Sequence, residues 1–294
     1  MIRRAVFYLN QKKENVLPTA KTCAALCRDF GITPVILSSD QALWESQTEA
    51  SQSQTFYADA PHRGVDDALF VFGGDGTVLR AMDAYVAEGL PILGINLGRL
   101  GFLPEVQTGE MAEAIRRVSD QDYHIKRRMM LFYEAHTARG VCKGYATNEV
   151  SVSRGLSQRC IAMDVKSDGA LVDHYIADGV LVATPTGSTA YSLSAGGPII
   201  SADVGCILIN PICPHALTAR PIILSDRSTI EVSLNMKELR VGSQLSADGV
   251  TLCELTNDDQ ITIRRSPYDA LFIRLSGERN PFALLRSKMN PSLL

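Results

Sequence analysis

An aspartate set among glycines is the feature of this sequence best suited to chemistry. Asp75 lies in the run Gly-Gly-Asp-Gly-Thr over residues 73–77, which directly follows five apolar residues, 68–72. Such an apolar run is typical of a strand buried on both faces of a parallel sheet, and the glycines let the backbone turn and approach a ligand. A helix that starts here, with Thr77 as its expected cap, would present free N–H groups to an anion. The stretch therefore predicts a phosphate-binding turn.

Asp75 is the unusual member of such an anion site. A carboxylate is repelled by phosphates unless a cation lies between them or the carboxylate acts as a base on a hydroxyl. The alternative interpretation is an ordinary turn, because Asp and Gly are common turn residues. The spacing matches neither the dinucleotide fingerprint G-x-G-x-x-G nor the P-loop with its lysine, so neither site is predicted.

The first part of the chain alternates strand-like and helix-like segments. The expected strands cover residues 5–9, 34–37, 68–72 and 91–96, and the expected helices cover 18–30, 77–89 and 108–118. This alternation predicts a three-layer, largely parallel α/β domain over residues 1–118. Residues 38–63 are polar and are expected to form a variable surface segment.

A second glycine loop follows the strand expected at residues 91–96. Gly98 and Gly101 bracket Arg99 there. Since the carboxyl ends of parallel strands meet at one edge of a sheet, we expect backbone amides and the Arg99 guanidinium at the same edge as Asp75.

After about residue 120 the pattern changes to short alternating strands without a long helix. The expected strands cover residues 129–137, 142–146, 161–165, 180–183, 206–209, 229–234 and 260–264. They predict an all-β second domain over residues 119–275. Residues 276–294 return to helical spacing and are expected to pack back on the first domain.

Asn148 and Glu149 are polar neighbours among β-branched residues. One of two neighbours on a strand points inward, and a buried carboxylate needs a partner, which bound hydroxyls or amides would supply. The alternative is the end of an edge strand at which both side chains are solvated.

The run 184–198 consists of small residues and prolines, apart from Tyr191 and Leu193. Its backbone can wrap closely around a ligand, its hydroxyls can donate hydrogen bonds, and the tyrosine ring can stack on a base. A solvent-exposed linker is the alternative, but Ser/Gly linkers do not normally lie between apolar strands. We therefore expect a binding site here.

His215 and the cysteines have plainer interpretations. Two prolines precede His215 and fix its loop, so a hydrogen-bonded structural histidine and a catalytic base are both open. Cys23 and Cys27 share a helix face without a second pair to complete a zinc site, which favours core packing. The seven cysteines lie among apolar neighbours and indicate reduced thiols in a cytoplasm.

The overall composition is that of an ordinary globular protein. Apolar residues make up 46% of the chain, and the net charge of −3 gives no general attraction to nucleic acid or to an anionic membrane. No window approaches 18 continuous apolar residues, and the first residues lack a cleavage pattern for export. We expect a soluble, unexported protein with no nucleic-acid or membrane partner.

Three motifs together resemble those of the NAD kinase family. They are residues 73–77, the pair Asn148-Glu149, and the run 184–198. The first is shared with 6-phosphofructokinases and with diacylglycerol and sphingosine kinases, whereas the third is long and close to diagnostic. The similarity covers nearly the whole chain apart from residues 38–63.

The resemblance implies transfer of the γ-phosphoryl group of ATP to the 2′-hydroxyl of the adenosine ribose of NAD, which gives NADP. Asp75 would be the proton acceptor that aligns the 2′-oxygen. A divalent metal cation, with Mg²⁺ preferred, would neutralise charge on the phosphates. The implied fold is a Rossmann-like α/β domain followed by a β-sandwich, and the implied assembly is a homodimer or homotetramer.

The same resemblance assigns binding residues in both domains. The phosphate and ribose region would be lined by Gly74, Gly76, Thr77 and Arg80. Ribose hydroxyls would bind Asn148 and Glu149, while Arg159 and Asp178 match contact positions of the family. The adenine and nicotinamide moieties would be held by Thr189, Ala190, Tyr191, Ser192, Leu193 and Ser194.

Two positions depart from the family pattern. Ile176 stands where many relatives have an arginine, so one cationic contact is missing. Val250 stands where the family often has glutamine, and the preceding Asp248 is assigned no role.

Two competing functions predict different features. A lipid kinase would have an exposed apolar or basic surface for a membrane and no need of the run 184–198. A catalytically silent NADP-binding module would have no use for Asp75 as a base. The sequence leaves open whether polyphosphate replaces ATP and whether NADH is accepted.

Overall fold

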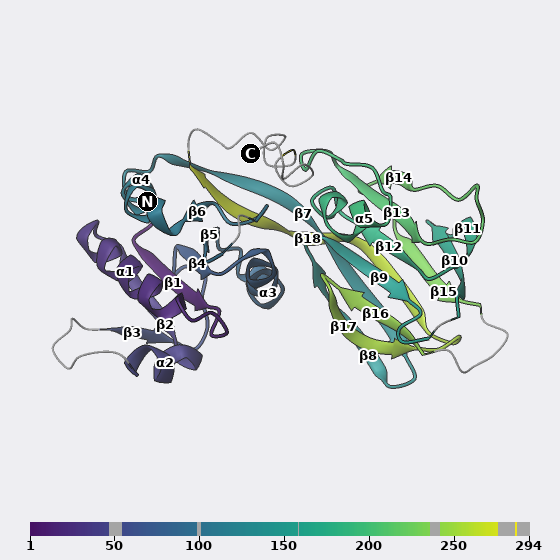
Figure 1. The fold of residues 1–294 in the computed structure, drawn as a ribbon, viewed down its shortest axis with the longest axis horizontal. Coiled ribbons are helices and arrows are strands. Elements are labelled where there is room, and N and C mark those ends of the chain that lie inside the picture. Colours follow the sequence, from purple (N-terminus) through teal and green to yellow (C-terminus); the bar gives the residue numbers. More distant parts are fainter. Residues whose placement is uncertain (47–54, 99–100, 158, 236–241, 276–285, 287–294) are drawn as a thin grey trace. The chain divides into compact units, whose positions relative to one another are not determined.

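The computed structural model describes residues 1–46, 55–98, 101–157, 159–235 and 242–275, together with Arg286. The chain divides into two compact units (Figure 1). Unit 1 contains residues 1–127 and the stretch that begins at Leu271, and unit 2 contains Arg128–Ala270. The division expected from sequence at residues 118 and 119 falls just before β7 (Tyr123–Thr137), a strand whose residues belong to both units.

Unit 1 is built on a parallel sheet. Its strands are β1 (Arg4–Leu9), β2 (Thr33–Leu37), β3 (Phe56–Ala58), β4 (Ala68–Phe72), β5 (Ile92–Asn96) and β6 (Val106–Gln107). They lie in the order β3-β2-β1-β4-β5, and β6 pairs with β5. The end of β18 (Gln260–Leu275) also pairs with β5 in parallel, through Phe272 and Ile92. The chain reverses its direction across the sheet between β1 and β4, and open α/β sheets bind ligands at such a point.

Helices cover both faces of this sheet. They are α1 (Val16–Asp29), α2 (Gln41–Glu45), α3 (Asp75–Tyr85) and α4 (Met111–Ser119), with short 3-10 turns at Ser38–Asp40, Val86–Glu88 and Thr108–Glu110. Leu17 of α1 and Ile115 of α4 share one core with Phe7 and Phe70 of the sheet. In Figure 1, α1 and α4 lie on one side of the strands and α3 on the other. The three-layer arrangement predicted from the sequence is confirmed.

Unit 2 contains two sheets. One holds β11 (Ala170–Ala177), β10 (Ile161–Ser167), β15 (Ile230–Leu234) and the first part of β18, with β7 and β8 (Gly140–Ala146) attached. The other has the order β14 (Ile222–Ser225), β13 (Cys206–Ile212), β12 (Gly179–Ala183), β9 (Glu149–Ser153), β16 (Ser243–Ala247) and β17 (Val250–Leu255). Val150 and Val180 of the second sheet share one core with Met163 and Val232 of the first. The predicted β-sandwich is therefore confirmed.

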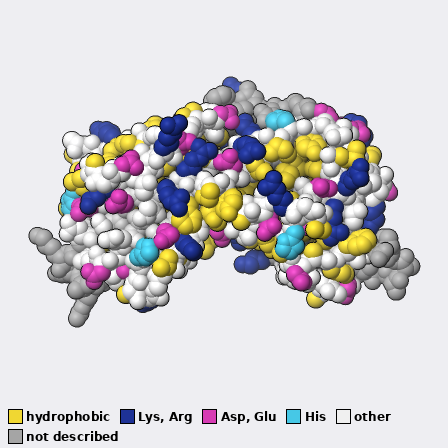
Figure 2. Space-filling model, turned by 180° about the vertical axis from the view of Figure 1, so that it is seen from behind, with side chains coloured by type: hydrophobic (Ala, Val, Ile, Leu, Met, Phe, Trp, Pro, Cys, Tyr) yellow, Lys and Arg dark blue, Asp and Glu magenta, His cyan; other side chains and the backbone are white. Residues whose placement is uncertain are grey.

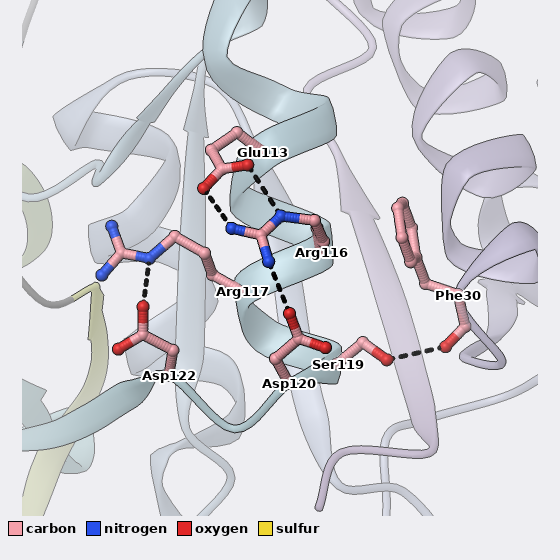
Figure 3. Close-up of polar contacts among 7 residues, drawn as sticks. All are labelled: Phe30, Glu113, Arg116, Arg117, Ser119, Asp120 and Asp122. Atoms are coloured by element: carbon pink, nitrogen blue, oxygen red, sulfur yellow. Dashed lines mark hydrogen bonds and ion pairs between the residues drawn. The ribbon is translucent and has the colours of Figure 1, made fainter.

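The exposed surface of α4 carries several ion pairs (Figure 3). Arg116 pairs with Glu113 at 2.6 Å and with Asp120 at 2.6 Å, one turn away in each direction. At the end of the helix the hydroxyl of Ser119 donates to the carbonyl oxygen of Phe30, 2.9 Å away, just after α1. This bond fixes the end of α4 against the end of α1.

Three local expectations differ from the structure. The helix expected to begin at Pro18 begins two residues earlier, at Val16. Proline is tolerated in the first turn of a helix, where its missing N–H group would have no partner within the helix. Residues 38–63 are not only a polar surface segment. They supply β3 and the buried Trp44, whose ring packs edge-on against Phe7. The helical tail expected over residues 276–294 lies outside the described residues except for Arg286.

A pair of substitutions on α4 separates core packing from surface charge. Ile115→Ala removes a fully buried side chain from the core of unit 1 and should lower the free energy of unfolding by about 2–5 kcal/mol. Arg116→Ala breaks solvent-exposed ion pairs and should cost far less. Urea unfolding of both variants checks this, and an equal loss in the two would contradict it.

Candidate functional site

The glycine turn follows β4 at the point where the sheet reverses direction. The N–H of Gly73 donates to Ile95 O at 2.9 Å, and the N–H of Asn10 donates to Phe72 O at 3.2 Å. The turn is therefore held between the ends of β1 and β5. A Cβ on Gly73 would overlap the side chain of Thr77, so only glycine fits there.

Thr77 does not cap the helix, which corrects the sequence-based expectation. Helix α3 begins at Asp75 after Gly74, without a side-chain cap. Thr77 lies in the first turn and is buried, and its Oγ1 accepts the Asn10 amide at 2.9 Å. Its hydroxyl therefore ties the turn to the end of β1.

Asp75 is held by the loop that follows β5. Its Oδ2 accepts the N–H of Phe102 at 3.1 Å, and its Oδ1 accepts the N–H of Leu103 at 3.0 Å. A Cβ on Gly101 would overlap the carboxylate, so glycine is needed for this approach. The expected amides are thus at Asp75, whereas Arg99 lies outside the described residues. Two bonds from backbone N–H groups fix the orientation of the carboxylate and leave it lone pairs for a further hydrogen bond.

The other residues assigned to this turn surround Asp75 in sequence and in space. Gly76 and Arg80 are exposed and Gly74 is half-buried. The Arg80 Nη2 donates to Thr77 Oγ1 at 3.4 Å. Together these residues form a partly exposed turn that carries the Arg80 cation and the fixed Asp75 carboxylate.

In unit 2, Asn148 and Glu149 lie at the end of a central strand. Glu149 opposes Ala183 of β12, and Val150 opposes Ala247 of β16. Strand β9 thus has a neighbour on each side, so the interpretation as a solvated edge strand is wrong. Glu149 is only 5% exposed.

The run 184–198 is folded against this pair. Thr184 Oγ1 donates to Thr147 O at 2.7 Å, and Thr184 N donates to Asn148 O at 2.8 Å. A Cβ on Gly187 would overlap Asn148 O. The backbone therefore passes Asn148 closely, as a wrapped site requires, and the linker interpretation is wrong.

Buried hydroxyls hold the rest of the run in place. Ser188 Oγ donates to Pro185 O at 2.7 Å and accepts the N–H of Ile200 at 2.9 Å. The Asn210 amide donates to Ser192 O at 3.0 Å and lies 3.2 Å from Ser192 Oγ. The sequence analysis assigned no role to Asn210, which reaches this run from β13.

The residues expected to hold adenine and nicotinamide differ in exposure. Ser192 is buried, Thr189, Ala190 and Leu193 are half-buried, and Ser194 is exposed. The side chain of Tyr191 is 47% exposed, which leaves its ring open to stacking, while its backbone N–H bonds to Glu149.

The surroundings of the Glu149 carboxyl favour its neutral form. Burial raises its pKa to about 8, with a further upward contribution from the charge of Asp248, while the N–H of Tyr191 acts in the opposite direction. Its Oε2 has no hydrogen-bond partner among the residues that the structure describes. Buried polar atoms normally have partners, so this oxygen is suited to bind a ligand group.

Asp248, to which the sequence analysis assigned no role, organises this end of the sheet. Its carboxylate accepts the N–H groups of Thr147, Asn148 and Glu149 at 2.8, 2.7 and 3.1 Å. The available signal was the Asp-Gly pair between two strand-like runs, which is typical of a hairpin turn.

Arg159 and Asp178 are not brought to Glu149. Asp178 directly precedes β12, whereas Thr184 directly follows it, so the two mark opposite ends of the strand. Asp178 pairs with Arg154 at 2.8 Å, and Arg159 is exposed nearby in the chain.

His215 belongs to the Asp178 end. Its Nε2 lies 3.2 Å from Cys160 Sγ, which is itself 3.6 Å from Asp178 Oδ1. The backbone N–H of His215 donates to Ile176 O at 2.9 Å.

The described residues contain no cluster of side chains suited to a metal ion. No group of three or more His, Cys, Asp or Glu side chains in these ranges could hold a metal ion. Cys23 and Cys27 are buried with their sulfurs 4.0 Å apart, which confirms core packing, and all seven cysteines have free thiols.

The buried carboxyl makes stability depend on pH. The pKa of Glu149 is about 8 in the fold, against an ordinary value of 4.5. The contribution of the neutral carboxyl to the free energy of unfolding is therefore fully present below pH 4.5. It is lost as the pH rises to and through about 8, by up to about 1.4 kcal/mol per pH unit. Glu149→Gln, which mimics the neutral form, should remove this decline in urea unfolding between about pH 5 and pH 9.

Glu231→Gln on β15 is the matched control for this prediction, since Glu231 is exposed. Its pH dependence should parallel that of the unsubstituted protein. A Glu149→Gln variant that also parallels it would show that Glu149 is ionised in the fold.

The sequence matches one protein family over most of its length. A family model described as the ATP-NAD kinase N-terminal domain matches residues 10–123, and one described as the ATP-NAD kinase C-terminal domain matches residues 147–275. The NAD kinase of Symbiobacterium thermophilum is 40% identical over 235 residues, which covers 79% of this chain and 81% of that protein. The NAD kinase of Desulforamulus reducens is 41% identical over 226 residues, which covers 76% and 77%.

Solved structures share the fold. Yeast NADH kinase complexed with NADH superposes with a TM-score of 0.86 at 23% identity, covering 99% of this chain and 88% of that one. An NAD kinase from Archaeoglobus fulgidus in complex with ATP superposes with a TM-score of 0.70 at 24% identity, covering 98% and 99%. Both domain matches and both relatives agree, and the chain belongs to the ATP-NAD kinase family.

Proposed function

We propose that this protein is an NAD kinase that transfers the γ-phosphoryl group of ATP to the 2′-hydroxyl of the adenosine ribose of NAD. The observation that carries the proposal is Asp75, a carboxylate fixed at a glycine turn where an α/β sheet binds ligands. Membership of the ATP-NAD kinase family supports the same reaction.

Asp75 is the proton acceptor in this proposal. The N–H groups of Phe102 and Leu103 orient its two oxygens before substrate binds, so no side-chain ordering is needed when the 2′-hydroxyl arrives. Acceptance of the hydroxyl proton makes the ribose oxygen a better nucleophile for in-line attack on the γ-phosphorus. Arg80, one turn along α3, is the cation of this turn and is suited to phosphate oxygens.

The dinucleotide is held in unit 2 by Asn148, Glu149 and the run that contains Tyr191. Buried polar groups with fixed backbone suit ribose hydroxyls and amide groups, and an exposed tyrosine ring suits a base. Arg159 and Asp178, at the other end of β12, are proposed as separate contacts.

We propose that magnesium enters with the nucleotide as its complex. The described residues offer no cluster of three metal-ligating side chains, so they do not fit a resident metal. Mg²⁺ commonly binds through substrate phosphates and water with few protein ligands, which agrees with this arrangement.

A cytoplasmic homodimer or homotetramer is the proposed working form. Among the described helices none combines the length and the apolar character that a bilayer crossing requires. On the face drawn in Figure 2 basic and acidic side chains are interspersed. The net charge of −3 gives no general attraction to nucleic acid, which agrees with a small-molecule substrate.

The test is an assay of purified protein with ATP, Mg²⁺ and NAD, in which an NADP-specific dehydrogenase detects the product. Asp75→Asn keeps the shape of the side chain but cannot accept the proton, so NADP formation should fall by at least about a hundredfold. Asp83→Asn, on the exposed part of the same helix, is the matched control and should retain activity.

The outcomes separate the hypotheses. If no NADP forms but NADP binds, the protein is a silent binding module. If Asp75→Asn retains full activity, the kinase assignment stands and the role of Asp75 is wrong.

Gly101→Ala tests the positioning of Asp75 without changing its chemistry. The added methyl group would overlap the carboxylate, so kcat should fall by about tenfold or more. Gly109→Ala is the control, since a Cβ there meets no atom within 4 Å. Equal kcat values in two folded variants would contradict this account.

A further inference from the structure

Two hairpin turns of unit 2 are built in the same way. Asp168-Gly169 joins β10 to β11, and Asp248-Gly249 joins β16 to β17. All four residues have positive φ, at 51° and 81° in the first turn and 47° and 78° in the second. Both are therefore type I′ turns, for which Asp-Gly is a favoured sequence.

In each turn the aspartate also bonds to a neighbouring strand. The N–H of Asp168 donates to Thr229 O, and its carboxylate accepts the N–H of Thr229, both at 2.9 Å. The N–H of Asp248 donates to Glu149 O at 3.0 Å. Bonds to a single residue beside the turn, Thr229 for Asp168 and the Glu149 carbonyl for the Asp248 N–H, are thus common to both turns.

Asp248 does more than this. Its carboxylate receives three consecutive N–H groups, those of Thr147, Asn148 and Glu149, at the point where the chain enters β9. Bonds to an ionised acceptor are stronger than neutral ones, so they fix the backbone that carries both ligand-binding side chains. The backbone bonds of Asp168 are to Thr229 and not to residues 147–149.

We propose that Asp248 is a positioning residue for the dinucleotide, acting by fixing the backbone of residues 147–149 and by setting the charge state of the Glu149 side chain. This inference rests on the proposed function and deepens it, because the ligand in question is NAD.

The groups around Glu149 allow this control. Asp248 faces it from the β16–β17 turn and contributes to the pKa of about 8, and the N–H of Tyr191 reaches it from the start of α5 (Tyr191–Ser194). On β12 the residue opposite Glu149 is Ala183, and on β16 Ala247 lies opposite the following residue, Val150. Neither alanine titrates. Burial is the largest cause of the raised pKa of Glu149, and the charge of Asp248 adds to it.

A neutral Glu149 has a defined use. It can donate its proton to a ligand oxygen while its other oxygen accepts, whereas an ionised carboxylate only accepts. NAD binding should therefore weaken as Glu149 ionises, both through the lost donor and through repulsion between the new charge and the pyrophosphate.

The experiment measures KM for NAD, KM for ATP and kcat from about pH 6 to pH 9.5 in four variants and the unsubstituted protein. The variants are Asp248→Asn, Glu149→Gln, the double variant, and Asp168→Asn as the matched turn control. Asp248→Asn keeps an acceptor oxygen for Asn148 and Glu149 but removes the charge.

Asp248→Asn should raise KM for NAD about tenfold at neutral pH, the scale of one lost charge-assisted hydrogen bond, with kcat and KM for ATP within about twofold. In the unsubstituted protein KM for NAD should rise above about pH 8. That rise should begin at lower pH in Asp248→Asn and vanish in Glu149→Gln. In the double variant the pH dependence should match Glu149→Gln alone.

Three outcomes would overturn the inference. They are a normal KM profile in Asp248→Asn, an equal change in Asp168→Asn, and a pH shift that persists in the Glu149→Gln background. The last would mean that Asp248 acts without Glu149.

A second readout keeps the inference independent of catalysis. The pH-dependent loss of unfolding free energy should end at lower pH in Asp248→Asn than in the unsubstituted protein, since ionisation of Glu149 becomes easier. An unchanged curve would overturn the control of charge. If no protein forms NADP, the proposed function fails, and this curve still decides whether Asp248 sets the charge of Glu149.

Discussion

Backbone N–H groups just outside a strand have no partner in the sheet and need another acceptor. In this protein two aspartates accept such groups at the candidate site. Asp75 receives the amides of Phe102 and Leu103, and Asp248 receives those of residues 147–149. Each carboxylate thereby ties together segments far apart in the sequence. Loss of one of these hydrogen bonds would leave an N–H group or a carboxylate without a partner, which costs free energy. The bonds therefore hold the backbone around Asp75 and around Asp248 in one conformation. The same groups that shape the loops also carry the charge on which the proposed reaction depends.

The sequence predicted the fold well because the strongest patterns were unambiguous. Five apolar residues before the glycine turn are typical of a fully buried strand, and β4 is buried throughout. The strands it did not predict, such as β11 and β17, are mostly apolar in sequence but have several exposed positions, so apolar and polar residues do not alternate with burial along them. Pairing with β10 and β16 holds them in the sheets.

The sequence predicted which residues form the site more accurately than it predicted the hydrogen bonds that position them. Motif spacing located Asp75, Glu149 and the run around Tyr191, since these residue types are rare in such settings. It could not find Asp248 or Asn210, whose roles arise from contacts over about a hundred and about twenty residues of sequence. It also assigned Thr77 to a cap, whereas the hydroxyl accepts a hydrogen bond from Asn10, the residue after β1. Propensity describes a residue's neighbours along the chain, and these contacts are set by the sheets.

Strand β18 has a consequence for how the chain is made. Unit 2 is inserted into unit 1, and the parallel pairing of Phe272 with Ile92 brings the end of the insertion back to the first sheet. A ribosome synthesises Ile92 long before Phe272. At about 5–20 residues per second, the sheet of unit 1 waits on the order of ten to forty seconds for its last strand. Meanwhile β6 pairs with β5 at Ile95 and Asn96, and the edge of β5 around Ile92 stays open. During that period the unpaired edge around Ile92 is a site for pairing with other chains, and the completion of unit 2 removes it.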